Sequence, residues 1–415
     1  MTAGPADDGH WVTVWAASAQ ATYPIGSAIA QPDLSTAIPD SARGLVDQSI
    51  RMLLRPALAS TRVRVRVSNR FGDRTLRCRG ASLGVHLGGG GLVPGSRVAV
   101  PELTLAPGEL AWSEAMTMPA LDAGRPSWPL PTLAFSAFVE GESGPITWHA
   151  KAMATSYVSE PGDREAAGAD TELGFPHTTT SIFFIDALDA WLPREAGALV
   201  AFGDSLTDGT ATTLNGFDRW TDVLQRALLA NGRHDLAVVN AGIGGNQVVG
   251  PPAGSGPWRG GPAAVDRLEH DVLSLSGVRT VVWLQGINDF SENGGADVEA
   301  VIDAMTRAVA RLRARGLRVV GATVPSALGS SRAGHGGAVQ DARRRGFNEV
   351  LRRRSPFDAL VDLDAALTDP ATGRLHAAFD RDSTFGEPGD GVHPGRAGHA
   401  AIARSVAETL GCRSA

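Results

Sequence analysis

Residues 198–209, ALVAFGDSLTDG, set the fold of the C-terminal half of the chain. Within them an apolar run ends at Gly203, and a polar turn with Asp204 and Ser205 leads into a stretch that can form a helix. The same order of apolar strand, loop and amphipathic helix recurs about five times after this point, which is typical of a parallel sheet covered by helices. We therefore predict an α/β domain over residues 195–412.

The other strands of this predicted sheet are four short apolar runs: AVVNAGI at 237–243, TVVWLQG at 280–286, RVVGATV at 318–324 and ALVDLD at 359–364. Amphipathic stretches lie between them, and several end at a glycine, as helix C-caps commonly do. Ligands of open parallel sheets bind at the carboxyl ends of the strands. The loops that follow these runs are therefore where we expect a functional site.

The pattern before this domain favours strands instead. TRVRVRVSN at 61–69 alternates apolar and charged residues, which indicates a half-buried strand. Its neighbours are short, rich in Val, Thr and aromatic residues, and separated by Gly/Pro turns such as LGGGGLVPG. We predict an all-β sandwich over residues 10–190, with a short linker around 190–197 and one helix around 45–58. A chain of 415 residues exceeds the usual size of a single core, which agrees with two domains.

Composition indicates a folded protein whose partners are not anionic polymers. Hydrophobic residues make up 43% and charged residues 20%, and the net charge is −6. Nucleic acids and anionic membranes are bound through a concentrated positive field, so we expect neither as a partner. A neutral or weakly polar small-molecule substrate fits better. The oligomeric state cannot be predicted from these features.

Other expectations concern compartment and cofactors. No stretch reaches the roughly 18 apolar residues of a membrane span, and the first residues show no basic segment followed by an apolar run. We expect a soluble protein, either cytoplasmic or secreted with its signal absent from this chain. Cys78 and Cys412 form no CxxC pair, and the histidines have no metal-ligand spacing. We predict no metal and no cofactor.

Four loops of the predicted sheet carry residues suited to acyl-transfer chemistry: GDSLTDG at 203–209, NAGIGGN at 240–246, GIND at 286–289 and DGVHP at 390–394. The first places a serine between a strand and a helix, the second can present backbone N–H groups to an anion, and the third offers an amide donor. In the fourth, Asp390 and His393 are three residues apart, so the carboxylate can hold one imidazole nitrogen while the other faces a nucleophile.

Each loop also has an ordinary structural interpretation. Ser205 can be a helix N-cap, the glycines a tight turn, Asn288 a turn former and the last loop the cap of the final helix. Asp204 is interpreted as structural, an acceptor of backbone N–H bonds that fix the turn. Because all four loops lie at the same sheet edge, we favour a shared site over four separate coincidences.

Two further features of the sequence are candidates for a site. GASLG at 80–84 matches the GxSxG pattern of a nucleophile elbow, but that elbow joins a strand to a helix and Ser82 lies among predicted strands. Trp220, Trp258 and Trp283 can line a sugar or acyl pocket, although aromatic residues are ordinarily part of a core.

The four loops, in this order, resemble the signature blocks of the SGNH (GDSL-type) serine hydrolases over about residues 197–410. The resemblance implies a flavodoxin-like three-layer α/β/α domain. It implies that Ser205 is the nucleophile and first oxyanion N–H, that Gly245 is the backbone donor (Gly244 if the turn is shifted by one), and that Asn288 is the side-chain donor. His393 resembles the general base, and Asp390 the residue that orients it.

The N-terminal half also resembles the front half of two-domain bacterial SGNH hydrolases, through WAASAQ at 15–20, SNRFGD at 68–73 and HAKAMATSYVS at 149–159. The resemblance implies a jelly-roll-like sandwich there. The predicted activity is cleavage of a carboxylic ester, with a short-acyl or carbohydrate acetyl ester as substrate. The alternatives are a lipase or lysophospholipase with longer acyl preference, and a carbohydrate-binding protein with a vestigial hydrolase half.

Overall fold

The computed structural model describes residues 8–23, 35–122, 130–251, 259–332, 334–380 and 389–412. These residues form two compact units. The first contains the chain up to Ala198 together with His234–Val239 and Leu275–Val278, and the second contains Leu199–Arg233, Asn240–Ser274 and the chain from Arg279 onward. Two short segments of the C-terminal half thus belong to the first unit.

The sheet of the C-terminal half has the strand order β18-β17-β19-β20-β21. Its strands are β17 Gly197–Gly203, β18 Leu236–Gly242, β19 Val278–Leu284, β20 Arg318–Ala322 and β21 Ala359–Val361. This is the order 2-1-3-4-5 of a flavodoxin-like doubly wound sheet, so the predicted fold class is confirmed. In such a sheet the chain changes direction between its first and third strands, here β17 and β19, and the crevice at their carboxyl ends is the usual ligand site.

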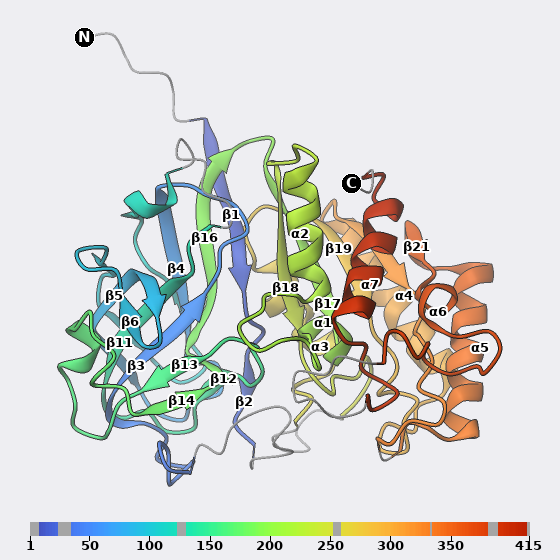
Figure 1. Ribbon diagram of the computed structural model, residues 1–415, viewed down its shortest axis with the longest axis horizontal. Helices are drawn as coiled ribbons and strands as arrows, with labels where there is room; N and C mark the ends of the chain where they lie inside the picture. The colour runs from blue at the N-terminus through green and yellow to red at the C-terminus, as the bar shows by residue number, and fades with distance from the viewer. Residues whose placement is uncertain are drawn as a thin grey trace. The chain divides into compact units, whose positions relative to one another are not determined.

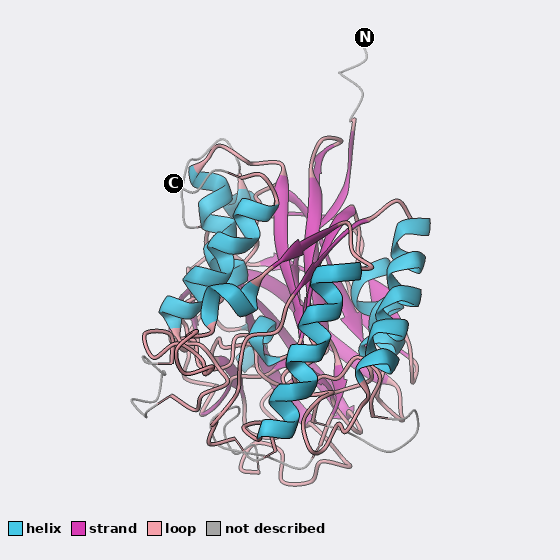
Figure 2. Cartoon of the chain, turned by 90° about the vertical axis from the view of Figure 1, so that its right-hand side faces the viewer, coloured by secondary structure: helices cyan, strands magenta, loops and turns pink. Residues whose placement is uncertain are grey.

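Helices cover this sheet in two groups, which Figure 2 shows on both sides of the strands. Packing contacts join α2 to α7, whereas α4 contacts α3 and α5. Figure 1 shows α2 and α7 side by side. The helices are α1 Ser205–Asp208, α2 Trp220–Ala230, α3 Ala264–Leu268 with a π-helical turn Glu269–Leu273, α4 Val298–Ala314, α5 Ala338–Arg354, α6 Leu363–Leu367 and α7 Arg396–Thr409.

Helix α4 shows why these stretches fold as they do. Its buried residues recur every three or four positions, which places one apolar face against the sheet: Val301, Ile302, Ala304, Met305, Ala308, Val309 and Leu312. Gly316 follows the helix with φ +75°, a conformation that glycine adopts without steric cost. In contrast, β17 is buried along its whole length, as expected of a parallel strand covered on both faces.

The N-terminal half is all-β, as predicted, with short 3₁₀ turns at Pro119–Leu121 and Ala166–Gly168. Its strands are β1 Gly9–Ala16, β2 Gln20–Ala21, β3 Val46–Leu54, β4 Arg62–Ser68, β5 Leu76–Gly88, β6 Gly91–Leu92, β7 Val98–Ala99, β8 Leu103–Leu105, β9 Leu110–Trp112, β10 Met116–Thr117, β11 Leu133–Glu142, β12 Thr147–His149, β13 Ser156–Val158, β14 His177–Thr179, β15 Ile182–Phe183 and β16 Ile185–Pro193.

These strands make three sheets: β1-β16-β4-β10 with β9, β14-β13-β3-β11-β5-β6 with β7 and β8, and β15-β12-β2. Strand β4 matches the alternating run at 61–69, and Val63, Val65 and Val67 are completely buried. The helix predicted around 45–58 is wrong, because this segment contains β3, paired with β11 and β13. Gln48 to Leu54 are all buried. A strand buried on both faces loses its alternating pattern and cannot be distinguished from a helix by periodicity.

Among the residues that the structure describes, no helix is long and apolar enough to cross a membrane.

Candidate active site

Ser205 lies two residues after the end of β17, as the first residue of α1, and is 5% exposed. Asp204 caps this helix, because its Oδ1 accepts the N–H of Leu206 at 3.0 Å. The structural interpretation of Asp204 is thereby confirmed. Gly203 allows the strand to pass close to β19, since a Cβ there would lie 2.3 Å from the carbonyl oxygen of Leu284. The turn therefore holds Ser205 at the carboxyl end of the sheet's first strand.

A chain of hydrogen bonds connects Ser205 to the loop before α7. His393 Nε2 lies 2.8 Å from Ser205 Oγ, and His393 Nδ1 lies 2.7 Å from Asp390 Oδ2. A carboxylate can only accept, so Nδ1 carries the hydrogen and Nε2 accepts from the serine hydroxyl. Asp390 Oδ1 also accepts the backbone N–H groups of Val392 and His393, both at 2.9 Å. The imidazole is thus oriented to take a proton from Ser205.

Asp390 lies in an environment that stabilises its charge. Burial alone would raise the pKa of Asp390, but the hydrogen bond and charge of His393, together with a bond from Arg332, lower this pKa well below its usual range. Arg332 Nε donates to Asp390 Oδ2 at 2.8 Å. The carboxylate is therefore ionised at neutral pH and can stabilise a positively charged imidazolium at His393.

The predicted oxyanion donors follow three neighbouring strands, with Ser205 after β17, Gly245 after β18 and Asn288 after β19. Within the described residues, the backbone N–H groups of Ser205 and Gly245 have no hydrogen-bond acceptor. Gly244, the alternative donor, gives its N–H to Asp208 Oδ2 at 2.8 Å. Gly245 has φ +82°. This engagement of Gly244 favours Gly245 as the group that can serve a ligand.

The amide of Asn288 is held at both ends. Its Nδ2 donates to the backbone oxygen of Asn246 at 3.0 Å, and its Oδ1 is 3.1 Å from Nε2 of His335. The residue is 8% exposed. Since an amide nitrogen has two hydrogens, one remains for a ligand.

Sequence reasoning missed a buried polar network beneath these loops. Arg267, on α3, is completely buried and donates to Gly203 O at 2.8 Å, Ala241 O at 2.9 Å and Asn246 Oδ1 at 2.8 Å. It therefore ties the ends of β17 and β18 to the loop that carries Gly245. Asn246 lies inside the NAGIGGN motif and could have been flagged from it. Nothing in the local sequence distinguishes Arg267 from a surface arginine.

Two carboxyl groups are buried close to Ser205. Burial raises the pKa of Asp204 to about 7, and the charge of Asp289 contributes to this increase. Burial likewise raises the pKa of Asp289 to about 6, although this side chain accepts the N–H groups of Val248 and Val249. Neither group contacts the imidazole in the hydrogen-bond chain, and both brace backbone turns.

The other candidates lie elsewhere. Ser82 is buried in the middle of β5, which pairs with β11, so GASLG is not a strand-to-helix turn. Trp220 and Trp283 are at most 1% exposed and belong to the core rather than to a pocket wall. Trp258 lies outside the described residues.

Comparison with known proteins gives a family and a set of similar structures. The GDSL-like Lipase/Acylhydrolase family model matches residues 201–401. No curated protein matches the chain in sequence.

Similar solved structures include Est24, a carbohydrate acetylesterase from Sinorhizobium meliloti, at 14% identity over 52% of this chain and 99% of that chain (TM-score 0.40). They also include the aryl esterase of M. smegmatis, at 16% identity over 52% of this chain and 98% of that chain (TM-score 0.40). A third is LAE5, an alpha/beta hydrolase enzyme from the metagenome of Lake Arreo, Spain, at 24% identity over 53% of this chain and 98% of that chain (TM-score 0.39).

Proposed function

Because the chain belongs, through residues 201–401, to the GDSL-like lipase/acylhydrolase family, we propose that it cleaves carboxylic esters with Ser205 as the nucleophile. The observation that carries this proposal is the continuous hydrogen-bond chain from Ser205 Oγ through His393 to Asp390. A serine hydroxyl is a weak nucleophile until a base takes its proton. In this chain the base is already in contact with the serine, and the group that orients the base is in contact with it on the other side of the ring.

The proposed reaction has two steps. His393 Nε2 takes the hydroxyl proton as Ser205 Oγ attacks the ester carbonyl, and the resulting imidazolium gives that proton to the departing alkoxide, which leaves as an alcohol. The acyl group is then bonded to Ser205. Water, deprotonated by the same imidazole, attacks this acyl-enzyme, and proton return to Ser205 releases the carboxylic acid.

Three N–H donors support the negative oxygen that forms in each step. We assign them to the backbone of Ser205, the backbone of Gly245 and the side chain of Asn288. Such donors contribute most when they are fixed before the reaction, because no reorganisation is then needed. The polar bonds that hold Asn288, and those from Arg267 to the loop of Gly245, supply this fixation.

For substrate, we propose a short-acyl ester, with deacetylation of a carbohydrate as the class to test. The negative net charge argues against an anionic partner. Long-chain lipases need an exposed apolar surface, and exposed patches of that kind are distinctive. Among the described residues of the second unit, the only large hydrophobic side chains that are exposed are Leu214 and Val339. This scarcity favours a short acyl group over the lipase alternative.

The test is hydrolysis of p-nitrophenyl acetate, butyrate and palmitate by the wild type, Ser205→Ala and Ser82→Ala. Ser82 is the matched control, because it is a buried serine in the competing GxSxG motif. We expect activity on the short esters, its loss in Ser205→Ala and its retention in Ser82→Ala. A fluorophosphonate should likewise label the wild type and Ser82→Ala but not Ser205→Ala. Equal activity of wild type and Ser205→Ala would refute the nucleophile, and a wild type that is neither active nor labelled would refute the proposed function.

A further inference from the structure

The segment between β20 and α5, residues 323–337, contacts the active site at two separate points. We call it the β20–α5 loop. Its residues Ser330 and Ser331 bind the backbone oxygen of Asp390, through Oγ at 2.6 Å and N–H at 3.1 Å. Its carbonyl at Gly334 accepts the N–H of Glu292, just beyond Asn288. The loop therefore lies against both the loop of the base and the loop of the oxyanion donor.

We propose that the β20–α5 loop is a positioning element of the active site, in which Arg332 holds the carboxylate of Asp390 and His335 holds the amide of Asn288. This inference rests on the proposed ester hydrolysis. Neither residue touches the reacting atoms, so both are positioning residues.

Arg332 acts on the orientation of the base. Its Nε donates to Asp390 Oδ2, the same oxygen that accepts His393 Nδ1–H. A carboxylate that accepts bonds on both oxygens has no freedom to rotate, since Oδ1 is already occupied by two backbone N–H groups. The guanidinium also places a positive charge beside this carboxylate. Arg332 thus fixes the geometry of the carboxylate and moderates the attraction that it exerts on a protonated His393.

His335 acts on the oxyanion donor. Its Nε2 is 3.1 Å from Asn288 Oδ1, and because that oxygen can only accept, Nε2 must carry a hydrogen. At the other end of the amide, Nδ2 donates to Asn246 O. Two bonds at opposite ends fix the plane of the amide and therefore the direction of its second N–H. A donor bond to Oδ1 also polarises the amide, which strengthens Nδ2–H as a donor.

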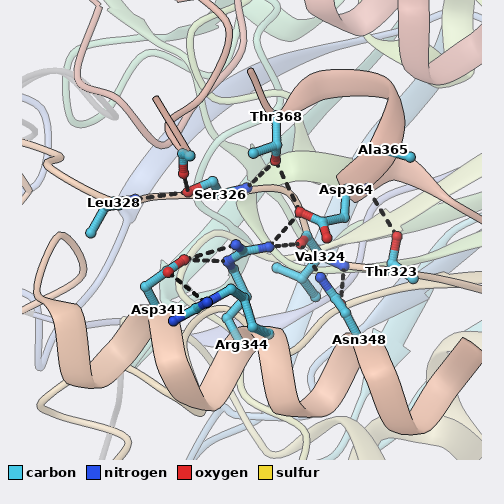
Figure 3. Close-up of polar contacts among 12 residues, drawn as sticks. Thr323, Val324, Ser326, Leu328, Asp341, Arg344, Asn348, Asp364, Ala365 and Thr368 are labelled. Carbon is cyan, nitrogen blue, oxygen red and sulfur yellow. Dashed lines mark hydrogen bonds and ion pairs between the residues drawn. The ribbon is translucent and has the colours of Figure 1, made fainter. Parts of the chain in front are cut away.

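The base of the loop is held by a buried polar cluster on α5, shown in Figure 3. Arg344 donates to Val324 O at 3.0 Å and pairs with Asp341 and Asp364, and only 3% of its side chain is exposed. Asn348 binds both the N–H and the oxygen of Val324, each at 2.8 Å.

Ser326, further along, accepts the N–H of Leu328 and gives its own N–H to Thr368. The stem of the loop is therefore rigid. A rigid stem matters because side chains that support a catalytic group must themselves be held in place.

The first test compares kcat and KM for p-nitrophenyl acetate in wild type, His335→Phe, His335→Gln, Asn288→Ala and the double variant His335→Phe/Asn288→Ala. Phe keeps a ring but donates nothing, whereas Gln keeps an N–H donor. We expect His335→Phe to lower kcat on the order of tenfold with little change in KM. Asn288→Ala, which removes the donor itself, should lower kcat by roughly 100-fold or more. His335→Gln should recover most of that loss. In the double variant, loss of His335 should have no further effect, because it acts only through Asn288.

The second test uses the pH profile of kcat/KM in wild type, Arg332→Gln, Arg332→Lys and the control Arg353→Gln. Among the residues that the structure describes, the charged or titratable groups that act on His393 or on its carboxylate partner are Asp390, Arg332, Asp380 and His399. Without the charge of Arg332, Asp390 stabilises the imidazolium more strongly, so the acid limb should move to higher pH in Arg332→Gln. Lys keeps the charge, so Arg332→Lys should shift the limb less. The control removes a positive charge from a side chain that is 77% exposed, and its profile should match the wild type.

The outcomes distinguish a failure of the positioning role from a failure of the proposed ester hydrolysis. If the wild type hydrolyses esters but the effects of His335→Phe and Asn288→Ala multiply independently, and the acid limb is unchanged in Arg332→Gln, the positioning role is refuted and the proposed function stands. If the wild type neither hydrolyses esters nor reacts with a fluorophosphonate, the proposed function fails and the positioning role fails with it. Should His335→Phe not fold, His335→Gln and the Arg332 series decide the question.

Discussion

Asp204, next to Ser205, should make the protein less stable as pH rises from about 4 to 7. Burial raises the pKa of this carboxyl from 3.8 to about 7. Between these two values the folded protein retains a proton that the unfolded chain has lost. Stability falls with pH wherever the native state binds more protons, so the destabilisation is absent below the unfolded pKa and complete above the folded one.

The size of this effect follows from the shift. A shift of about 3 pKa units corresponds to about 4 kcal/mol at 1.36 kcal/mol per unit. Asp289, whose pKa is raised to about 6, acts in the same direction and is electrostatically coupled to Asp204. In Asp204→Asn the amide oxygen can still accept Leu206 N–H. Oδ2 is buried without a hydrogen bond, so the new NH₂ lacks a partner, at a cost of about 1–3 kcal/mol that does not depend on pH.

The assay is urea unfolding of wild type and Asp204→Asn from pH 4 to 8, with the difference in free energy of unfolding taken at each pH. Taking this difference cancels the pH-dependent contributions of the titratable groups that both proteins share. We expect the variant to gain about 4 kcal/mol relative to wild type between pH 4 and 8. Asp303→Asn, at an exposed position on α4, is the matched control and should give a flat difference. A flat difference for Asp204→Asn, or one of the opposite sign, would refute the protonated state of this carboxyl.

Two further variants test the groups around Ser205. Asn288→Ala should lower kcat on the order of 100- to 1,000-fold for p-nitrophenyl acetate, with an unchanged circular dichroism spectrum, because it removes one fixed oxyanion donor. Arg267→Met should lower the free energy of unfolding by about 3–5 kcal/mol, since it leaves Asp271 buried without the guanidinium that pairs with it at 2.7 Å. Urea unfolding at pH 7 measures this loss, and a change below about 1 kcal/mol would show that the buried pair is not needed.

The sheet and the strand-end residues could be predicted from the sequence because their signals are local. Each apolar run is followed within a few residues by a polar loop, so the positions of Ser205 after β17 and Asn288 after β19 follow once the strands are recognised. The α4 helix is visible from its apolar periodicity alone. The segment at β3 lacked such a signal, because burial on both faces removed the alternation that marks a strand.

The supporting residues could not be predicted, because their partners are distant in the chain. Arg332 lies 58 positions from Asp390, and His335 lies 47 positions from Asn288. Both are in a stretch of Gly, Ser and Ala with no periodicity, which indicates a loop and nothing about its contacts. His335 has no metal-ligand spacing, and its sequence context indicates no partner for it. Pairings of this kind become visible only when the strand order brings the ends of β19 and β20 side by side.

The arrangement of these supporting groups explains how side chains from separate loops are held together at the carboxyl ends of the strands. The proposed nucleophile, base and oxyanion donors come from four separate loops, and loops are ordinarily the least rigid part of a fold. In this protein three of these loops are tied to their neighbours by polar side chains: the completely buried Arg267 for the loops after β17 and β18, and the partly buried His335 for the loop after β19. Buried polar bonds add little net stability but are costly to break. Substitutions at such positions should therefore alter activity and stability together, whereas Asn288→Ala, which removes the donor itself, should alter mainly kcat.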